Sequence, residues 1–355
     1  MSNAPALSVV VAASDSAAAV ARTLESLRAQ LPDVPFEVIV AAPFQGRLEG
    51  VTWVVAAPGT GVPRLRRLGF DRATASVVAF TEDSCVVSPG WVAAWIQAFE
   101  ESTIEAATGP VEPGMGDSCV DWSVFFCEYA PFLRRGSTGF PPPVRPAVPA
   151  GLPLGRHSRP YESTRENHGS GNGSRPTKRL AGNNFAVRRD SPWIQSKEDV
   201  HEMEVAGAIL ARRGLMREVG PAAVRHVRRY SPRQALGDRL RFGREFGRLR
   251  EAHRPLWFRP LTMLSGPAIL AVQAARLTAI VLGERCHLGR FLQCLPITLA
   301  LLCAWSAGEW WGGLTAPLRR PGACRPRETE DRLDAPGPRP SRSRRSRCKP
   351  ARPSA

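Results

Sequence analysis

A short apolar run in this chain ends at two acidic residues, Glu82 and Asp83. The run, Val-Val-Ala-Phe-Thr, is typical of a buried parallel strand, which would place both carboxylates at the carboxyl edge of a sheet. Ligands of open α/β sheets bind at that edge. Carboxylate oxygens there suit a divalent cation that is itself held by phosphates. An acid after a strand is also a common helix N-cap, so the pattern alone leaves a purely structural role open.

Strands and helices alternate around this run. Apolar, β-branched segments predict strands over residues 7–13, 36–42, 52–56, 77–80 and 106–112. Apolar residues at helical spacing predict helices between them, the first with Ser14, Asp15 or Ser16 as its N-cap. Alternation of this kind predicts an α/β fold with a doubly wound, mainly parallel sheet, in one domain over residues 1–230.

The pattern is interrupted in the second third of the chain. Residues 136–176 are rich in Pro, Gly, Ser and Arg and are predicted to form a long mobile loop. Beyond it, residues 180–190 regain order, an acidic helix is expected over residues 198–213, and a last strand and turn over residues 221–230.

The chain changes character after residue 230. Residues 231–259 predict a basic interfacial helix, and residues 261–282 and 295–311 are apolar. A spanning helix needs about 20 apolar residues. We therefore expect residues 260–315 to form a helical hairpin of one or two membrane helices, lying in or across the bilayer, with buried soluble helices as the alternative. Residues 316–355, rich in Arg and Pro, are predicted to be disordered.

The charge of the chain indicates the kind of partner. Lys and Arg number 48 against 32 Asp and Glu, a formal net charge of +16. Residues 318–355 hold 12 basic and 4 acidic residues, and residues 225–259 are also basic. Because both regions flank apolar segments, an anionic membrane surface is favoured over nucleic acid, for which no recognised motif appears. The eight cysteines lack metal-ligand spacing, which predicts reduced thiols.

The order of these motifs resembles the family-2 glycosyltransferases with the GT-A fold, in their membrane-associated bacterial form. The similarity covers about residues 7–250 and rests on segments 8–13, 64–69, 81–85, 181–189, the acidic helix and Val224-Arg225-His226. It implies an inverting transfer of a sugar from a nucleotide-diphosphate sugar to a lipid-linked or envelope-glycan acceptor. The enzyme would sit at the inner membrane with its catalytic domain in the cytoplasm. Because no Gln-x-x-Arg-Trp segment follows, single transfers are expected rather than processive synthesis.

The resemblance also implies roles for residues on the donor side. Glu82-Asp83-Ser84 stands where the family carries Asp-x-Asp, so Asp83 is the expected ligand of Mg²⁺ or Mn²⁺, and Glu82 would face the nucleotide. His226 stands where relatives place a His near the metal, although a surface histidine is the alternative. Ala41-Ala42-Pro43 replaces the family's acidic pair after the second strand, which leaves Asp15 as the nucleotide-side acid. Arg67, like Arg64, would lie near the diphosphate unless both belong to a solvated helix face.

On the acceptor side, Gly182, Asn183 and Asn184 resemble the family's acceptor-binding loop, with a plain turn before a strand as the alternative. Attack by an acceptor hydroxyl requires a carboxylate base. Glu198, Asp199 and Glu202 are the candidates, and Glu198 and Glu202 would share one helix face. In many relatives the acidic pair lies about a dozen residues before the glycine that ends the helix, and counting back from Gly214 gives Glu202. Asp199 would instead lie in the first turn, where its side chain is free to point into the cleft. We prefer Asp199.

A second interpretation belongs to another functional class. The incomplete acidic motif at residues 82–84 and the missing acid after the second strand are also expected of a catalytically inactive relative. Such a protein would act as a membrane-bound scaffold or binding protein. Divalent-dependent binding and turnover of a nucleotide-sugar distinguish the two interpretations.

Overall fold

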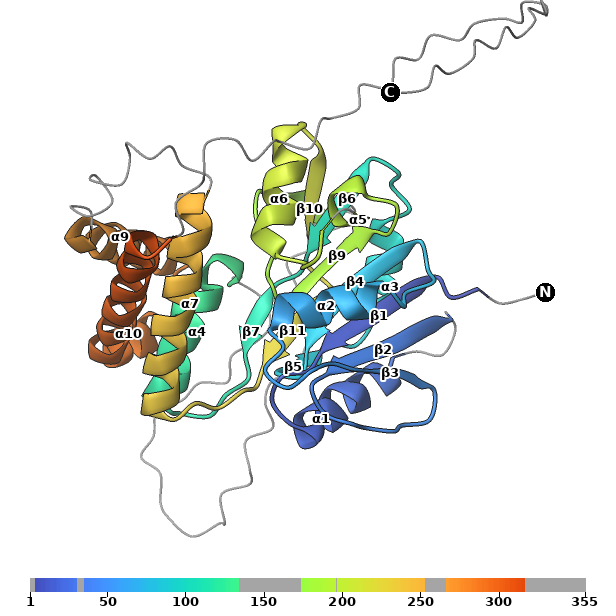
Figure 1. The fold of residues 1–355 in the computed structure, drawn as a ribbon, viewed down its shortest axis with the longest axis horizontal. Coiled ribbons are helices and arrows are strands. Elements are labelled where there is room, and N and C mark those ends of the chain that lie inside the picture. The colour runs from blue at the N-terminus through green and yellow to red at the C-terminus, as the bar shows by residue number, and fades with distance from the viewer. Residues whose placement is uncertain (1–3, 31–34, 134–173, 196, 253–265, 317–355) are drawn as a thin grey trace, which may run out of the picture. The chain divides into compact units, whose positions relative to one another are not determined.

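The structure is a computed structural model that describes residues 4–30, 35–133, 174–195, 197–252 and 266–316 (Figure 1). Residue contacts group Met1–Ala316 into one unit. Most of the predicted loop and nearly all of the predicted C-terminal tail lie outside the described residues.

A mixed sheet forms the centre of the described part of the chain. Its strand order is β3-β2-β1-β4-β9-β6-β10-β8. The strands are β1 (Leu7–Ala12), β2 (Phe36–Ala42), β3 (Val51–Val55), β4 (Val77–Glu82), β6 (Ile104–Thr108), β8 (Ser174–Pro176), β9 (Asn184–Arg188) and β10 (Leu215–Val219). Strands β3, β2, β1 and β4 run parallel, as do β6 and β10, while β9 lies antiparallel between β4 and β6. The predicted α/β fold with a mainly parallel sheet is confirmed.

Strand β8 corrects the end of the predicted loop at residues 136–176. Its three residues pair antiparallel with β10 at the sheet edge, and Arg175 forms an ion pair of 3.3 Å with Glu218. The composition of the segment predicts a loop because Ser, Arg and Pro have no strand preference of their own. The pairing with β10 supplies the strand conformation instead.

A second, smaller sheet lies next to the carboxyl end of β4. It contains β5 (Cys85–Val87), β11 (Val224–His226) and β7 (Val111–Pro113), with β11 in the middle. The turn between β4 and β5 is held by Thr23, whose buried hydroxyl donates to the Cys85 carbonyl at 2.7 Å and lies 3.3 Å from the Asp83 carbonyl. The backbone around Asp83 is thereby fixed to the first helix.

Helices cover the sheet and extend beyond it (Figure 1). They are α1 (Ala17–Arg28), α2 (Val62–Phe70), α3 (Trp91–Ala98), α4 (Cys119–Tyr129), the 3₁₀ turn η1 (Ala130–Phe132), α5 (Pro192–Gln195), α6 (Glu202–Ala211), α7 (Pro232–Ala252), α9 (Gly266–Glu284) and α10 (Leu288–Leu314). Of the three predicted N-cap candidates, Ser16 caps α1, with its hydroxyl accepting the Ala19 N–H at 3.2 Å. Helix α4 was not predicted, because six consecutive residues of it are buried and no one-sided apolar pattern remains.

Helix α6 begins later than predicted. Its first residue is Glu202, so Glu198 and Asp199 lie in the bend before the helix and do not share a helix face with Glu202. The cause is a contact outside the helix, because the Val200 N–H donates to the Pro63 carbonyl at 3.0 Å. At the other end, Arg213 takes the left-handed conformation with φ 60°, one residue before Gly214.

The C-terminal helical hairpin is present as α9 and α10. Helix α10 packs against α7, α4 and α9. Among the described helices, α10 is the one long and apolar enough to cross a membrane by length and composition. The predicted first span at residues 261–282 falls mostly on α9, which is not such a helix, and residues 261–265 lie outside the described part.

Helices α7 and α10 approach each other through glycines. Two glycines on each helix are spaced four residues apart: Gly243 and Gly247 on α7, and Gly308 and Gly312 on α10. A Cβ atom added at any of them would meet a backbone carbonyl oxygen of the other helix, those of Trp305, Glu309, Leu240 and Arg244 respectively. The two backbones are therefore in direct contact.

Candidate active site

Asp83 lies in the turn directly after β4 and is 2% exposed. Its Oδ2 accepts the backbone N–H of Asp15 at 2.7 Å, which brings together two residues predicted for the donor side. Burial raises the pKa of Asp83 to about 6; the Asp15 hydrogen bond opposes this, and the charge of Glu82 adds to it. A carboxylate whose charged form is disfavoured in this way gains from a nearby cation.

His226 ends β11, directly across from Cys85 of β5 in the small sheet. It is 1% exposed, so the alternative of a surface histidine is wrong. Burial, followed by the charge of Arg228, lowers the pKa of His226 to about 3, so the imidazole is neutral. Its Nδ1 has no hydrogen-bond partner among the described residues. An unpartnered, neutral ring nitrogen lacks a hydrogen bond or metal bond that a ligand could supply.

A divalent cation fits these residues only if a substrate phosphate and water supply the rest of its ligands. Within the described residues, no group of three or more His, Cys, Asp and Glu side chains is placed to hold a metal. Asp83 and the unpartnered nitrogen of His226 are the two protein groups that would serve as ligands. A cation such as Mg²⁺ keeps several waters and takes its remaining ligands from substrate phosphates, so a few protein ligands suffice.

Arg228, which the sequence analysis missed, supplies positive charge beside these groups. Its Nη2 lies 3.8 Å from Oδ1 of Asp15, and its guanidinium stands over the Tyr230 ring at 5.2 Å. Both side chains of the Arg228–Asp15 pair are partly exposed. The signal available in the sequence was its position two residues after His226, because alternate residues of an extended chain point to the same side.

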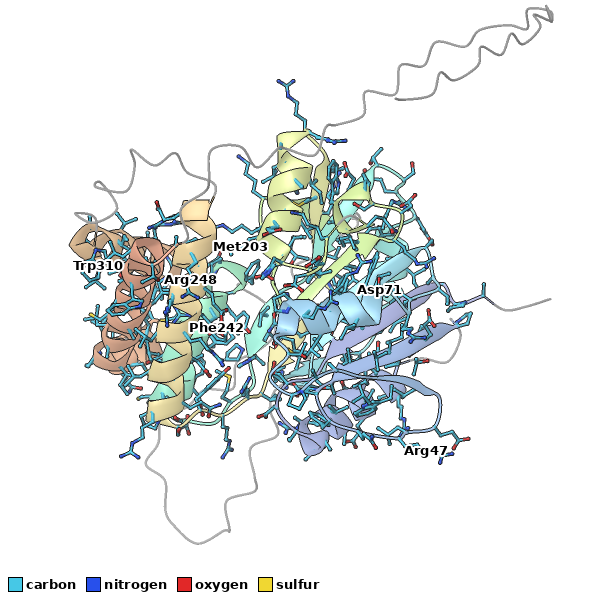
Figure 2. All side chains as sticks on the ribbon, in the orientation of Figure 1. Arg47, Asp71, Met203, Phe242, Arg248 and Trp310 are labelled. Carbon is cyan, nitrogen blue, oxygen red and sulfur yellow. The ribbon has the colours of Figure 1, made fainter. Side chains whose placement is uncertain are left out.

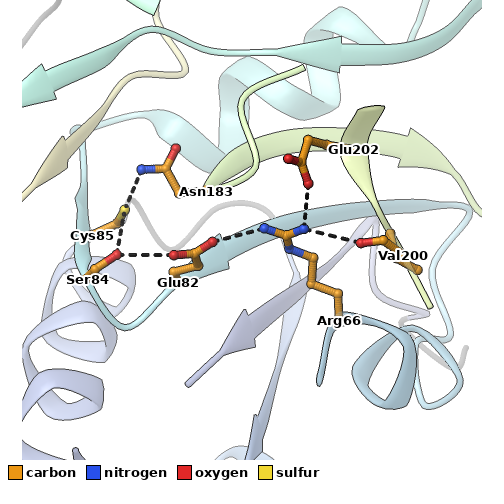
Figure 3. Close-up of polar contacts among 7 residues, drawn as sticks. All are labelled: Arg66, Glu82, Ser84, Cys85, Asn183, Val200 and Glu202. Atoms are coloured by element: carbon orange, nitrogen blue, oxygen red, sulfur yellow. Dashed lines mark hydrogen bonds and ion pairs between the residues drawn. The ribbon is translucent and has the colours of Figure 1, made fainter. Parts of the chain in front are cut away.

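Arg66 on α2 is the other residue that the sequence analysis missed (Figure 3). The side chain is buried, and its Nη2 contacts Oε1 of Glu82 at 2.9 Å while its Nη1 contacts Oε2 of Glu202 at 2.8 Å. The same Nη1 donates to the Val200 carbonyl at 3.2 Å. Burial alone lowers the pKa of Arg66, but the charges of Glu202 and Glu82 outweigh it and raise that pKa. Arg66 thus joins the end of β4 to the start of α6.

This arrangement separates the three acids proposed as the base. The Glu202 carboxylate is bound to Arg66, and Glu198 is exposed, with its carbonyl accepting Arg64 Nη1 at 2.6 Å. Asp199 is partly exposed, and its carboxylate has no hydrogen bond or ion pair to another described residue. The carboxylates of Glu198 and Asp199 are therefore both without a partner among the described residues, and Asp199 is the less exposed of the two.

Arg67 differs from its predicted place near a diphosphate. Its guanidinium donates to the Ile194 carbonyl, pairs with Asp71 at the C-cap of α2, and lies over the Phe70 ring. Helix phase explains the difference, because Leu65, Arg66 and Gly69 form the buried side of α2. Arg66, rather than Arg67, faces the end of β4.

In the predicted acceptor loop, the Asn184 side chain is fully used in hydrogen bonds within the fold, whereas that of Asn183 is only partly used. Asn184 begins β9, and its amide donates to the Ala222 and Pro110 carbonyls at 2.8 and 3.1 Å and accepts Trp91 Nε1 at 3.0 Å. This role in the fold differs from the acceptor contact expected of Asn184. Asn183 donates to Cys85 Sγ at 3.3 Å, but its Oδ1 has no partner among the described residues.

Gly182 lies against the Arg66 bridge. A Cβ at this position would come within 2.9 Å of Arg66 Nη2 and 3.2 Å of the Glu202 carboxyl carbon. Only a residue without a side chain leaves the bridge undisturbed.

Comparison with known proteins finds no matching protein-family model and no matching curated protein. Solved structures do match. One is GalNAc-T7 with UDP, GalNAc and Mn²⁺, at 15% identity and a TM-score of 0.43, covering 64% of this chain and 44% of that chain. Another is the mannosyltransferase PcManGT from Pyrobaculum calidifontis in complex with GDP-Man and Mn²⁺, at 15% identity and a TM-score of 0.47, covering 87% of this chain and 88% of that chain.

The chain spans less than half the length of the first of these structures. At such identities and TM-scores, neither likeness assigns a substrate or a reaction to this chain.

Proposed function

We propose that this chain is a metal-assisted, inverting glycosyltransferase with the GT-A fold, which moves a single sugar from a nucleotide-diphosphate sugar to an acceptor hydroxyl. One observation carries the proposal: the turn that holds buried Asp83 is joined to the segment of His226 and Arg228 by a hydrogen bond of 2.8 Å from the Val227 N–H to the Ser84 carbonyl, and Nδ1 of buried His226 has no partner among the described residues. A carboxylate, an imidazole and a guanidinium in one place suit a divalent cation held together with a diphosphate.

The donor side follows from these contacts. Asp83 and His226 would hold Mg²⁺ or Mn²⁺, and the cation would supply positive charge to neutralise the diphosphate leaving group. The Asp15 N–H fixes the orientation of the Asp83 carboxylate, and Arg228 adds positive charge on the same side. Glu82 is held by Arg66 and would act through position rather than as a metal ligand.

On the acceptor side, Asp199 would take the proton of the attacking hydroxyl. The neighbouring Val200 is held by Arg66 through its carbonyl and by Pro63 through its N–H, so the segment that carries Asp199 is fixed relative to the end of β4. The buried Oδ1 of Asn183 has no partner among the described residues, and an acceptor hydroxyl that reached it would supply one. A lipid-linked or envelope-glycan acceptor at the inner membrane, with the catalytic domain cytoplasmic, would suit the apolar C-terminal hairpin. The absence of a Gln-x-x-Arg-Trp segment supports single transfers.

The test measures donor binding and turnover separately. The purified full chain is assayed with UDP- and GDP-sugars in the presence of Mn²⁺ or Mg²⁺, with hydrolysis of the donor as the acceptor-free readout. Asp199→Asn should keep donor affinity and lose turnover by roughly 10²–10⁴-fold, because a base acts in the transition state. Glu198→Gln, one residue away and exposed, is the matched control and should keep its turnover.

Two results would contradict the proposal in different ways. Normal turnover in Asp199→Asn together with loss in Glu202→Gln would move the base to Glu202. No metal-dependent binding of any nucleotide-sugar would instead support the inactive membrane scaffold.

A further inference from the structure

The C-terminal hairpin leaves a large apolar surface uncovered. Val272 and Leu282 of α9 are 55% and 51% exposed, and Leu292, Leu299 and Trp311 of α10 are 59%, 41% and 53% exposed. Helices α9 and α10 lie on the side of α7 away from the sheet (Figure 1), and Figure 2 shows Trp310 there. We call the exposed apolar residues of α9 and α10 the hairpin face. Exposed apolar side chains that gather on adjacent helices mark interaction sites more often than scattered ones do.

The charges around the hairpin face indicate what covers it. Arg276 on α9 and Arg285 in the turn are exposed, and α7 beside the hairpin exposes Arg241, Arg244 and Arg248. Apolar side chains bordered by arginines match a bilayer with anionic headgroups, in which the apolar groups enter the acyl boundary and the arginines stay at the phosphates. Long basic side chains such as Arg276 reach the headgroups from an apolar surface.

The inner side of α10 shows how the hairpin can meet a bilayer. Its N-terminal half is covered by α4: the rings of Phe291 and Phe126 lie 5.2 Å apart, and the Thr298 hydroxyl donates to Ser123 Oγ at 3.1 Å. Its C-terminal half is covered by α7 through the paired glycines. Glu309, buried within α10, is bound by Arg250 of α7 and by Gln273 of α9, the latter at 3.1 Å.

Because one side of α10 is covered along both halves of the helix, α10 cannot cross a bilayer without leaving these partners. Helix α7 exposes several arginines, and α4 packs on strand β7 of the small sheet, so neither can enter the hydrocarbon core. We propose that α9 and α10 form a monotopic anchor that lies in the plane of an anionic phospholipid surface, with the hairpin face inward, and does not span the membrane. This inference is independent of the proposed sugar transfer.

The first test is binding to vesicles by flotation, using the purified full chain. Vesicles of phosphatidylglycerol and phosphatidylcholine should bind the protein at least tenfold more tightly than vesicles of phosphatidylcholine alone. Leu292→Glu and Leu299→Glu place a charge on the hairpin face and should weaken binding at least tenfold. Val55→Glu, at a position 54% exposed on edge strand β3, is the matched control and should bind like the parent. Circular dichroism confirms that each variant is folded.

The second test distinguishes an in-plane hairpin from a spanning one. Cys286 lies in the turn between α9 and α10. When the protein is bound to preformed sealed vesicles, a membrane-impermeant maleimide added outside should modify Cys286, as read by peptide mass spectrometry. Protection of Cys286 until the vesicles are lysed would show that the hairpin crosses the bilayer and would overturn the proposal.

A second copy of the chain is the competing occupant of the hairpin face. It predicts a dimer in solution, measured by light scattering, that Leu292→Glu converts to a monomer, with no binding to either kind of vesicle. That result, or vesicle binding that both Glu substitutions leave unchanged, would also overturn the proposal.

Discussion

The buried position of Asp83 disfavours its negative charge in the free protein, whereas a bound cation would stabilise that charge. Its pKa is raised to about 6 in the folded chain, above the ordinary value of 3.8. A carboxyl that binds its proton more tightly when folded stabilises the fold fully below pH 3.8, and this stabilisation is lost as the pH rises through about 6. One pKa unit corresponds to about 1.4 kcal/mol, so the loss is about 1–3 kcal/mol at neutral pH.

We therefore predict that Asp83→Asn stabilises the metal-free protein at pH 7.5 by about 1–3 kcal/mol. The Asn side-chain oxygen can still accept the Asp15 N–H while carrying no charge. Urea unfolding measures the difference, and the gain should shrink at pH 4.5, where Asp83 is already protonated. Divalent-dependent donor binding should be lost in the same variant. A variant less stable than the parent at pH 7.5 would show that the Asp83 charge is compensated within the fold.

Arg66 is the second residue whose environment makes a sharp prediction. It is buried between two carboxylates, so replacing it leaves Glu82 and Glu202 facing each other without a counter-charge. Arg66→Met should lower the free energy of unfolding by about 3–5 kcal/mol, the usual cost of breaking a buried ion pair from one side.

Arg64→Met, two residues away, is the control for Arg66→Met. Arg64 is exposed and makes a single hydrogen bond to the Glu198 carbonyl, so its loss should cost less than about 1 kcal/mol. Urea unfolding of both variants makes the comparison. Equal losses would mean that the Arg66 bridge does not hold the end of β4 to α6.

At the scale of elements, the contact between α7 and α10 depends on four glycines. An added methyl group at Gly308 would meet the Leu240 carbonyl oxygen, which is backbone and cannot rotate away. Gly308→Ala should therefore destabilise the protein by about 1–3 kcal/mol, as overpacking usually does. Gly237, also on α7, has nothing within 4 Å of its added Cβ, so Gly237→Ala should stabilise by about 0.5–1 kcal/mol through helix propensity. Thermal unfolding compares the two variants. If both midpoints moved in the same direction, the close backbone contact between α7 and α10 would be contradicted.

The elements also show which parts of the fold the sequence could predict. Strands β1 and β4 are almost wholly buried, and β2 is buried over its last four residues. Their apolar composition therefore identified them and placed Glu82 and Asp83 at a strand end. The predicted start of α6 was wrong because Glu198 and Asp199 resemble the acidic first turn of a helix, although they precede it. The helix starts later because the Val200 N–H donates to the carbonyl of Pro63, which is more than a hundred residues away in sequence.

At the scale of the whole molecule, the sequence indicated which residues belong to the candidate site, but not which of them contact one another. Acids after a strand and a late histidine are local features, and Asp15, Asp83 and His226 all lie near the junction of the two sheets. The Arg66 bridge joins residues 66, 82 and 202, and no local pattern specifies which face of α2 turns toward the end of β4. Contacts of this kind depend on how the whole chain is arranged.

The glycine contact between α7 and α10 also limits how this chain can diverge over generations. In most helix pairs a larger side chain on one helix can be compensated by a smaller one on the other. Here each position already holds the smallest residue, so no compensating change exists at Gly243, Gly247, Gly308 or Gly312. The hairpin could not be exchanged for another apolar hairpin by recombination unless the newcomer brought both of its glycines in register. Helix α7 and the hairpin should therefore be inherited as one piece.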